Sequence, residues 1–216
     1  MLPEAIVFDL DGTLIDTEAT WDEVRRGLAE EAGLPWPTGA TQAMMGMSTP
    51  EWAHYLVETV GLPLTDEQAA RATIEAMAAH HERGVELLPG ALEVVHRLAA
   101  EYPMAVASSS PRVLIDAALR AMNITHLFQA TVSTEEVERG KPEPDGYLKA
   151  AELLGADPGR CVAIEDSTNG ILSALNAGMK VIVIPPHFHP PSQEVLDETT
   201  VLETLDELTL DLLAGL

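Results

Sequence analysis

Five short apolar runs, separated by longer stretches of helical pattern, constrain the fold of this chain most strongly. The runs cover residues 5–8, 104–107, 130–132, 161–164 and 181–184. They are rich in β-branched residues and bounded by turn-forming residues, as is typical of buried strands. The stretches between them predict helices over about residues 90–101, 111–122, 144–154 and 168–177. Strands that alternate with helices predict an α/β fold, in which helices cover both faces of a doubly wound parallel sheet.

Residues 17–87 interrupt this alternation. Their sequence contains no convincing strand and predicts helices over about 17–32, 49–60 and 65–83, with prolines between them. The strand–helix pattern resumes after this stretch, at Pro89-Gly90. The sequence therefore predicts two domains, an α/β core formed by residues 1–16 and 88–216 and an all-helical insertion formed by residues 17–87.

The composition limits the partners of the chain. With 35 acidic and 12 basic residues, its formal net charge is −23, and it has no basic tract that would bind nucleic acid or an anionic membrane surface. No apolar run approaches the length of about 18 residues that a membrane span needs, and the first residues lack a basic leader, so we expect a cytoplasmic monomer. The single cysteine, Cys161, excludes an internal disulfide. His187 and His189 have no third ligand near them in the sequence, so we expect no zinc site.

Polar residues follow three of the predicted strands directly. These clusters are Asp9 with Asp11, Ser108-Ser109-Ser110, and Glu165 with Asp166. Because open parallel sheets bind ligands beyond the carboxyl ends of their strands, we expect these side chains to share one crevice. Lys141, in a loop ahead of the helix predicted over 144–154, is a further candidate.

The residue types in these clusters indicate phosphate chemistry. Four carboxylates in one crevice would repel one another unless a cation lay among them. Hard oxygen donors suit Mg²⁺, which proteins usually hold through one or two carboxylates together with substrate oxygens. Beside such a cation an ionised aspartate can approach a phosphoryl group, while a lysine and a serine bind the remaining phosphate oxygens. The clusters thus offer a nucleophile, a second carboxyl for proton transfer, a metal site and a phosphate-binding site.

Taken together and in this order, these motifs resemble the haloacid-dehalogenase superfamily of aspartate-nucleophile phosphatases. The resemblance rests on the runs Asp-Leu-Asp-Gly-Thr-Leu-Ile-Asp (9–16), Gly-Lys-Pro-x-Pro-Asp (140–145) and Glu-Asp-Ser-x-x-Gly (165–170). It covers the whole chain, since the helical cap predicted after the first motif resembles the cap of the subfamily that includes β-phosphoglucomutase and sugar phosphatases. Residues 11–22 look most like the 2-deoxyglucose-6-phosphatase type. The resemblance implies a Rossmann-like core that carries an inserted helical cap.

The resemblance implies a role for each acidic residue of the motifs. Asp9 attacks phosphorus and becomes an aspartyl-phosphate, and Asp11 first protonates the leaving alkoxide and then deprotonates the attacking water. Mg²⁺ is held by the Asp9 carboxylate, the Asp11 backbone carbonyl and Asp166. Glu165 lies near the metal or binds it indirectly.

The resemblance also implies which residues bind the substrate. Ser108, the backbone amide of Ser109 and Lys141 bind the transferring phosphoryl group. In the helical insertion, Trp21 and Met47 are candidates for substrate contacts, although apolar residues at helical spacing equally suit the core of the insertion.

The expected function is therefore Mg²⁺-dependent hydrolysis of a small phosphate ester, such as a sugar or polyol phosphate. One alternative is a phosphomutase of the β-phosphoglucomutase type, but those mutases carry arginine where Thr49 stands and histidine where Trp21 stands. A second is a catalytically idle phospholigand-binding protein, against which the intact Asp9 and Asp11 argue. The absence of any lysine before Lys141 disfavours a phosphonoacetaldehyde hydrolase, and the second aspartate of the first motif disfavours a dehalogenase.

Overall fold

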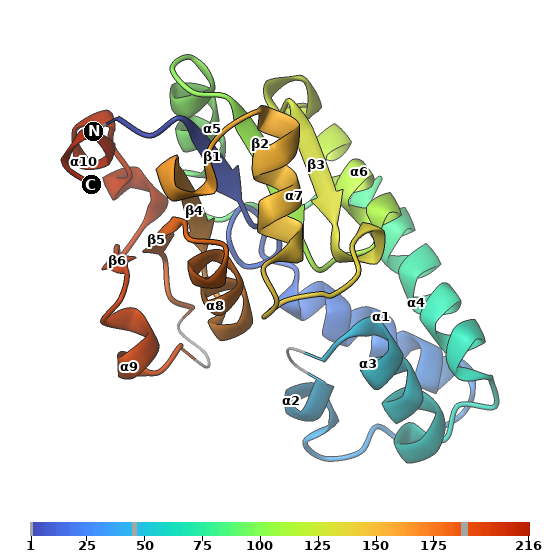
Figure 1. The fold of residues 1–216 in the computed structure, drawn as a ribbon. Helices are drawn as coiled ribbons and strands as arrows, with labels where there is room; N and C mark the ends of the chain where they lie inside the picture. Colours follow the sequence, from blue (N-terminus) through green and yellow to red (C-terminus); the bar gives the residue numbers. More distant parts are fainter. Residues whose placement is uncertain (1, 45–46, 187–189) are drawn as a thin grey trace. The chain divides into compact units, whose positions relative to one another are not determined.

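The strand–helix alternation builds a sheet of six parallel strands in the order β3-β2-β1-β4-β5-β6 (Figure 1). The computed structural model of the chain describes residues 2–44, 47–186 and 190–216. The strands are β1 (Ala5–Phe8), β2 (Met104–Ser108), β3 (Ala130–Ser133), β4 (Cys161–Glu165), β5 (Lys180–Val183) and β6 (Thr200–Val201). This strand order is that of a doubly wound, Rossmann-like sheet, so the predicted fold class is confirmed.

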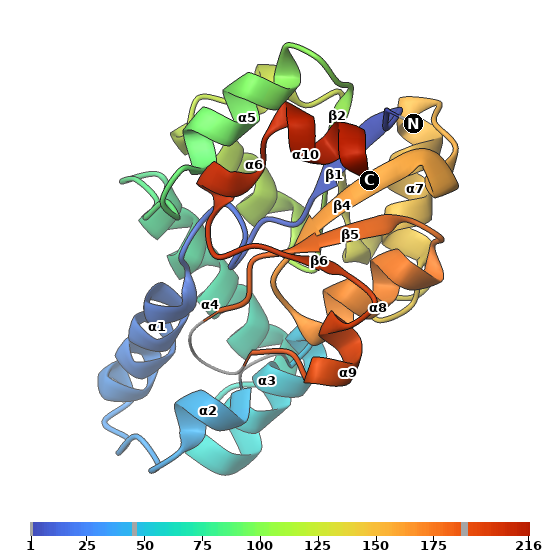
Figure 2. The ribbon, with the colours of Figure 1, turned by 90° about the vertical axis from the view of Figure 1, so that its left-hand side faces the viewer.

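Helices cover both faces of this sheet. They are α5 (Ala91–Ala99), α6 (Arg112–Ala121), α7 (Asp145–Leu154), α8 (Thr168–Asn176), α9 (Gln193–Leu196) and α10 (Leu210–Gly215). Short 3-10 turns lie at η2 (Thr125–Leu127), η3 (Thr134–Glu136), η4 (Pro158–Arg160) and η5 (Leu205–Glu207). Helices α7 and α8 pack on one face, and α5, α6 and α10 pack on the other (Figures 1 and 2).

The side chains of β1 show why its run is apolar throughout. Ile6 and Phe8 belong to the apolar cluster that includes α5 and α6, whereas Ala5 and Val7 belong to the cluster that includes α7 and α8. Successive residues of a strand point to opposite faces, and both faces of this sheet are covered. All four side chains are fully buried as a result.

The strand ends differ slightly from the predicted runs. The second and fourth strands each continue by one residue, so that Ser108 and Glu165 are their last residues. The fifth begins one residue earlier, at the exposed Lys180, and ends at Val183. Strand β6 was not predicted, because a strand of 2 residues leaves no alternating pattern in the sequence.

The chain divides into two compact units, here named the core unit (1–16 and 85–216) and the helical unit (17–84). The helical unit contains α1 (Glu18–Glu31), α2 (Ala40–Met44), α3 (Thr49–Tyr55), the π-helical segment η1 (Leu56–Val60) and α4 (Asp66–His81). These helices pack around an apolar cluster of their own, with Trp52 and Leu56 buried in it. In the residues that the structure describes, no helix is long and apolar enough to cross a membrane.

A capping box fixes where α4 begins, and a glycine marks where η1 ends. Thr65 accepts a hydrogen bond from the Gln68 N–H, while the Gln68 side chain accepts one from the Thr65 N–H, which forms a capping box at the start of α4. The helix predicted over 49–60 is α3 followed by η1, and it ends before Gly61, whose φ is +88°. Helix α2 was not predicted, because 5 residues are too few to show a helical period.

The packing of α5 against the sheet can be tested with paired leucine substitutions. Leu98 is fully buried, so Leu98→Ala leaves a cavity and lowers the free energy of unfolding by about 2–5 kcal/mol. Leu153 on α7 is 52% exposed, and Leu153→Ala changes that free energy by no more than about 0.5 kcal/mol. Urea unfolding followed by circular dichroism measures both, and equal effects of the two substitutions would contradict the described packing.

Candidate active site

Three carboxylates meet at the point where the order of the strands reverses. Strands β1 and β4 are neighbours there, and ligands of open α/β sheets bind beyond the carboxyl ends of such strands. Asp9 follows β1, and its N–H donates a hydrogen bond of 2.9 Å to the Ile164 carbonyl of β4. Glu165 ends β4, and Asp166 comes next. One oxygen atom from each of the three carboxylates lies within 4.8 Å of the others.

Lys141 connects two of these carboxylates. Its Nζ lies 2.6 Å from Asp9 Oδ1 and 2.6 Å from Glu165 Oε1, and its side chain is 6% exposed. Burial alone would lower the pKa of Lys141, but the charges of Asp9 and Glu165 outweigh burial and raise it above its ordinary value. Lys141 is therefore a permanent cation beside Asp9.

Of the three carboxylates, Glu165 accepts the most hydrogen bonds. Its Oε1 accepts hydrogen bonds from Lys141 and from Tyr147 Oη, the latter at 2.8 Å. Its Oε2 accepts from the N–H groups of Asp166 (3.0 Å) and Ser167 (3.1 Å) and from Ser167 Oγ (3.1 Å). Burial would raise the pKa of Glu165, but the charge of Lys141 and these hydrogen bonds lower it. Glu165 is thus an ionised group that holds Lys141 in place.

The serines after β2 hold Asp11. Ser108 is buried, and its Oγ accepts a hydrogen bond from the Ser110 N–H at 3.0 Å. Ser110 Oγ donates to Asp11 Oδ2 at 2.6 Å, while the Ser110 carbonyl accepts from Ser133 Oγ at 2.7 Å. Ser109 is exposed next to them. Among the described residues, the Asp11 carboxylate does not belong to the close group formed by Asp9, Glu165 and Asp166. The expected bond from the Asp11 backbone carbonyl to a metal ion stays a prediction.

The three carboxylates suit a hard divalent cation. Asp166 Oδ1 is buried without a hydrogen-bond partner among the described residues. Burial raises the pKa of Asp9 to about 8, and burial together with the charges of Glu165 and Asp9 raises the pKa of Asp166 well above its ordinary value. All three donors are carboxylate oxygens, and the unpaired Asp166 oxygen is a position that a cation would satisfy. The residues present therefore fit Mg²⁺.

The candidates in the helical unit, Trp21 and Met47, are partly buried and pack against its apolar core. The Trp21 ring lies 5.8 Å from the Trp52 ring, and Met47 is half-buried against the same cluster. Their contact with a substrate stays a prediction. Of the other residues considered in the sequence, His187 and His189 lie outside the part of the chain that the structure describes.

The sequence did not identify the residues that position the predicted site residues. Tyr147 looks in the sequence like one more apolar residue of a helix that packs on the sheet, and nothing there shows that its hydroxyl bonds Glu165. Ser110 was not separated from the two serines before it. Gly170 ends a motif that the sequence did show, but its role is visible only in the structure, where a Cβ would lie 1.6 Å from Glu165 Oε1.

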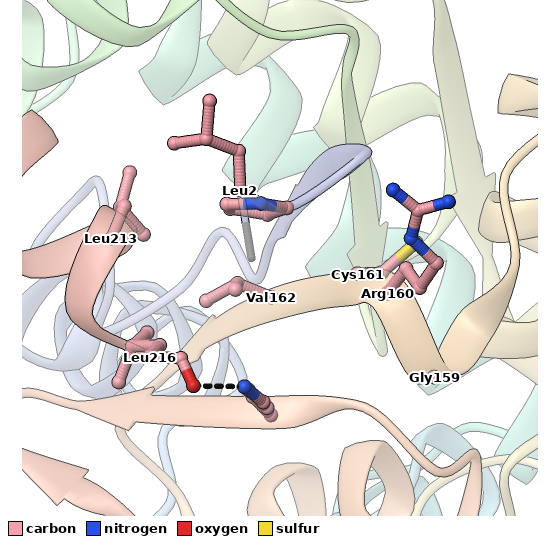
Figure 3. Close-up of a pocket in the computed structure, with 9 residues that line it drawn as sticks. Leu2, Gly159, Arg160, Cys161, Val162, Leu213 and Leu216 are labelled. Carbon is pink, nitrogen blue, oxygen red and sulfur yellow. Dashed lines mark hydrogen bonds between the residues drawn. The ribbon is translucent and has the colours of Figure 1, made fainter.

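A separate cavity of about 160 Å³ lies at the opposite, amino-terminal ends of the strands (Figure 3). Leu2, Leu213 and Leu216 contribute apolar side chains to its lining, and Cys161 also lines it. Burial, followed by the charges of Glu4 and Asp157, raises the pKa of the Cys161 thiol to about 11, which keeps the thiol protonated near neutral pH. The described residues that line this cavity include no grouping of carboxylates like that at the other end of the sheet.

Comparison with known proteins gives the family. The family model described as haloacid dehalogenase-like hydrolase matches residues 6–184. Fructose-1-phosphate phosphatase YqaB of Escherichia coli is 33% identical over 82% of this chain and 94% of its own length, and hexitol phosphatase A of Escherichia coli is 33% identical over 96% and 94%. The crystal structure of CbbY from Rhodobacter sphaeroides with phosphate superimposes with a TM-score of 0.84, at 29% identity and with 96% of each chain covered. The chain therefore belongs to the haloacid dehalogenase-like hydrolase family, and the enzyme class expected from the sequence, a phosphoric monoester hydrolase, is confirmed.

The tight packing of Gly170 against Glu165 generates a prediction. In Gly170→Ala the new Cβ would displace the Glu165 carboxylate and, with it, Lys141. We expect the turnover of an aryl phosphate to fall by about 10²-fold, because small displacements of positioning groups have effects of that size.

The matched control is Gly27→Ala in α1, where a Cβ would meet no atom within 4 Å. It should keep the activity and stabilise the helix by roughly 0.5–1 kcal/mol. Steady-state kinetics and thermal unfolding of both variants provide the test. Wild-type turnover in folded Gly170→Ala would show that the position of Glu165 does not matter.

Proposed function

We propose that this chain is a Mg²⁺-dependent phosphatase that hydrolyses sugar or polyol phosphates through an aspartyl-phosphate on Asp9. The observation that carries the proposal is the position of Asp9, which lies 2.6 Å from Lys141 and beside two further carboxylates at the carboxyl ends of β1 and β4. Relatives named as a fructose-1-phosphate phosphatase and a hexitol phosphatase support the substrate class.

The first half-reaction transfers the phosphoryl group to Asp9. A carboxylate oxygen of Asp9 attacks phosphorus, the bond from phosphorus to the ester oxygen breaks, and Asp11 gives its proton to the leaving alkoxide. In the second half, Asp11 takes a proton from water, whose oxygen attacks phosphorus and releases Asp9 and inorganic phosphate. The hydrogen bond from Ser110 Oγ to Asp11 Oδ2 supports this role, because it fixes the carboxyl that moves the proton.

The remaining residues of the site would bind the phosphoryl oxygens and the metal ion. Lys141, Ser108 Oγ and the Ser109 N–H would bind oxygens of the phosphoryl group. The Asp9 carboxylate, Asp166 and the Asp11 backbone carbonyl would hold Mg²⁺. Both oxygens of Glu165 already accept hydrogen bonds, which favours a role for Glu165 in holding Lys141 over a direct bond to the metal. When bound, Mg²⁺ would offset the charges of the carboxylates and of the phosphoryl oxygens.

Removal of the nucleophile or of the metal tests the mechanism. Asp9→Asn should lower kcat for an aryl phosphate by on the order of 10³-fold or more, since the covalent route is lost. EDTA should abolish turnover by the wild-type enzyme, and added Mg²⁺ should restore it. Release of the aryl alcohol, followed by absorbance, measures both effects.

The control and the direct evidence come from separate measurements. Asp211→Asn makes the same chemical change at an exposed residue of α10 and should leave kcat unchanged. Hydroxylamine treatment during turnover should convert an aspartyl-phosphate to a hydroxamate that peptide mass spectrometry locates at Asp9. Turnover retained in Asp9→Asn, or a hydroxamate at another residue, would refute the mechanism.

The substrate class is tested with a panel of phosphate esters. We expect kcat/KM for hexose and hexitol phosphates to exceed that for an aryl phosphate by about 10-fold or more. The reason is that contacts to the hydroxyl groups of the sugar or polyol can stabilise the transition state. Glucose 1-phosphate belongs in the panel because it separates hydrolysis, which gives free glucose, from phosphoryl transfer, which gives glucose 6-phosphate. Mutases of the β-phosphoglucomutase type carry an arginine at the position where this chain has the uncharged Thr49, the first residue of α3. We therefore expect free glucose. Accumulation of the 6-phosphate would favour the mutase alternative.

A further inference from the structure

The loop that carries Lys141, here named the lysine loop (residues 140–144), is anchored by helix α8 of the same unit. Ser173 of α8 donates a hydrogen bond from its Oγ to the Glu143 carbonyl at 2.5 Å. Ser173 is fully buried, so water does not replace it as the donor to this carbonyl. The main chain two residues after the lysine is therefore held by a single buried hydroxyl.

The same helix reaches the lysine loop at a second point and also contacts Glu165. Asn176 Nδ2 donates to the Pro142 carbonyl at 3.3 Å. Gly170 lies so close to Glu165 that a Cβ there would overlap the carboxylate. Gly170, Ser173 and Asn176 are spaced three residues apart, and residues at this spacing are neighbours on the surface of a helix. One side of α8 thus contacts both the lysine loop and a carboxylate that pairs with the lysine.

Lys141 depends on the position of its loop. Its Nζ makes contacts of 2.6 Å with Asp9 and with Glu165, and it reaches them on a flexible four-carbon chain. Within the loop itself, a turn joins the Glu143 N–H to the Gly140 carbonyl at 3.0 Å. A displacement of about 1 Å in a group that positions a reaction can cost about 10²-fold in rate. The bonds that fix the loop from outside therefore matter for the place of Nζ.

The contacts on the solvent side of the lysine loop are weaker. Arg139 forms ion pairs with Glu143 at 2.9 Å and with Asp145 at 2.8 Å, but the Arg139 side chain is 56% exposed. Exposed ion pairs contribute little to stability. Loss of a buried donor costs more, because the acceptor is left without a partner. Ser173 is therefore the contact whose loss would disturb the loop most.

We propose that Ser173 and Asn176 are positioning residues, which hold the lysine loop so that Lys141 can bind the transferring phosphoryl group. The inference rests on the proposed function and adds to it two residues that lie outside the sequence motifs. Neither side chain would touch the substrate, since each acts on a main-chain carbonyl that follows the lysine. Ser173 has the larger effect of the two, because its hydrogen bond is shorter and fully buried.

The kinetic test removes each donor in turn. Ser173→Ala leaves the Glu143 carbonyl without its donor, and we expect kcat/KM for p-nitrophenyl phosphate to fall by about 10-fold, the effect of losing one buried hydrogen bond. The inhibition constant of inorganic phosphate, which would bind at the same lysine, should rise by about the same factor. Asn176→Ala should lower kcat/KM by about 2-fold to 3-fold, because its bond is longer and exposed.

Thr199→Val is the matched control. Thr199 Oγ1 donates to the Leu196 carbonyl at 2.8 Å, just before the edge strand β6. The substitution thus removes the same kind of bond elsewhere in the core unit and keeps the shape of the side chain. It should leave kcat/KM and the inhibition constant of phosphate unchanged, while thermal unfolding measures the stability that each variant loses.

Chemical labelling of lysines separates this inference from the proposed function. The chain has three lysines, Lys141, Lys149 and Lys180. The Lys141 side chain is 6% exposed, whereas that of Lys149 is 43% exposed and Lys180 is also exposed. Ser173→Ala should raise the rate at which an N-hydroxysuccinimide ester acetylates Lys141 by about 3-fold to 10-fold, because the loop opens more often. The rates at the other two lysines, measured by peptide mass spectrometry, should not change.

The outcomes of these measurements are distinct. Folded Ser173→Ala in which Lys141 is labelled at the wild-type rate, or in which kcat/KM is unchanged, would overturn the inference. If Ser173→Ala did not fold, the labelling of Lys141 in Asn176→Ala would decide, with a faster rate in favour and an equal rate against. A wild type that hydrolysed no phosphate ester would refute the proposed function, and the labelling would still decide whether α8 holds the lysine loop.

Discussion

The ion pairs of Lys141 with Asp9 and Glu165 are the interaction on which the rest of the site depends. They join the loop after β3 to the ends of two neighbouring strands, β1 and β4, through contacts of 2.6 Å. A buried lysine would be unstable as a cation on its own, and two buried carboxylates would repel each other. Lys141 and Glu165 therefore keep each other charged, and loss of either partner would leave uncompensated charge in the interior.

The sequence predicts the components of this arrangement because sheet topology determines where they meet. Asp9 and Glu165 each stand at the carboxyl end of an apolar run, and parallel strands bring those ends to one edge. The supporting hydrogen bonds could not be predicted in the same way. Tyr147 and Ser110 act through single hydroxyl groups whose direction depends on how α7 packs and how the chain turns after β2, and neither leaves a pattern in the sequence.

The helical unit was harder to interpret for a different reason. Helical periodicity identifies its long helices but not the 5-residue helix α2 or the π-helical turns that follow α3. Arg25 and Arg26 are adjacent and identical in the sequence, yet Arg25 is buried against two tryptophans and Arg26 forms an ion pair with Asp22. Their positions around the axis of α1 decide this difference, because successive residues of a helix point about 100° apart.

The two units share a physical feature, which is a buried polar atom that the described chain leaves without a partner. In the core unit one such atom is Asp166 Oδ1, which lies beside two other carboxylates, and in the helical unit one such atom is Arg25 Nε. The charges are opposite, so the partners that would satisfy them are a cation in the first case and an oxygen acceptor in the second. The net charge of −23 does not oppose binding of a phosphate ester in the core unit, because charges beyond about 8–10 Å are screened at ordinary salt, whereas Lys141 lies in direct contact with Asp9.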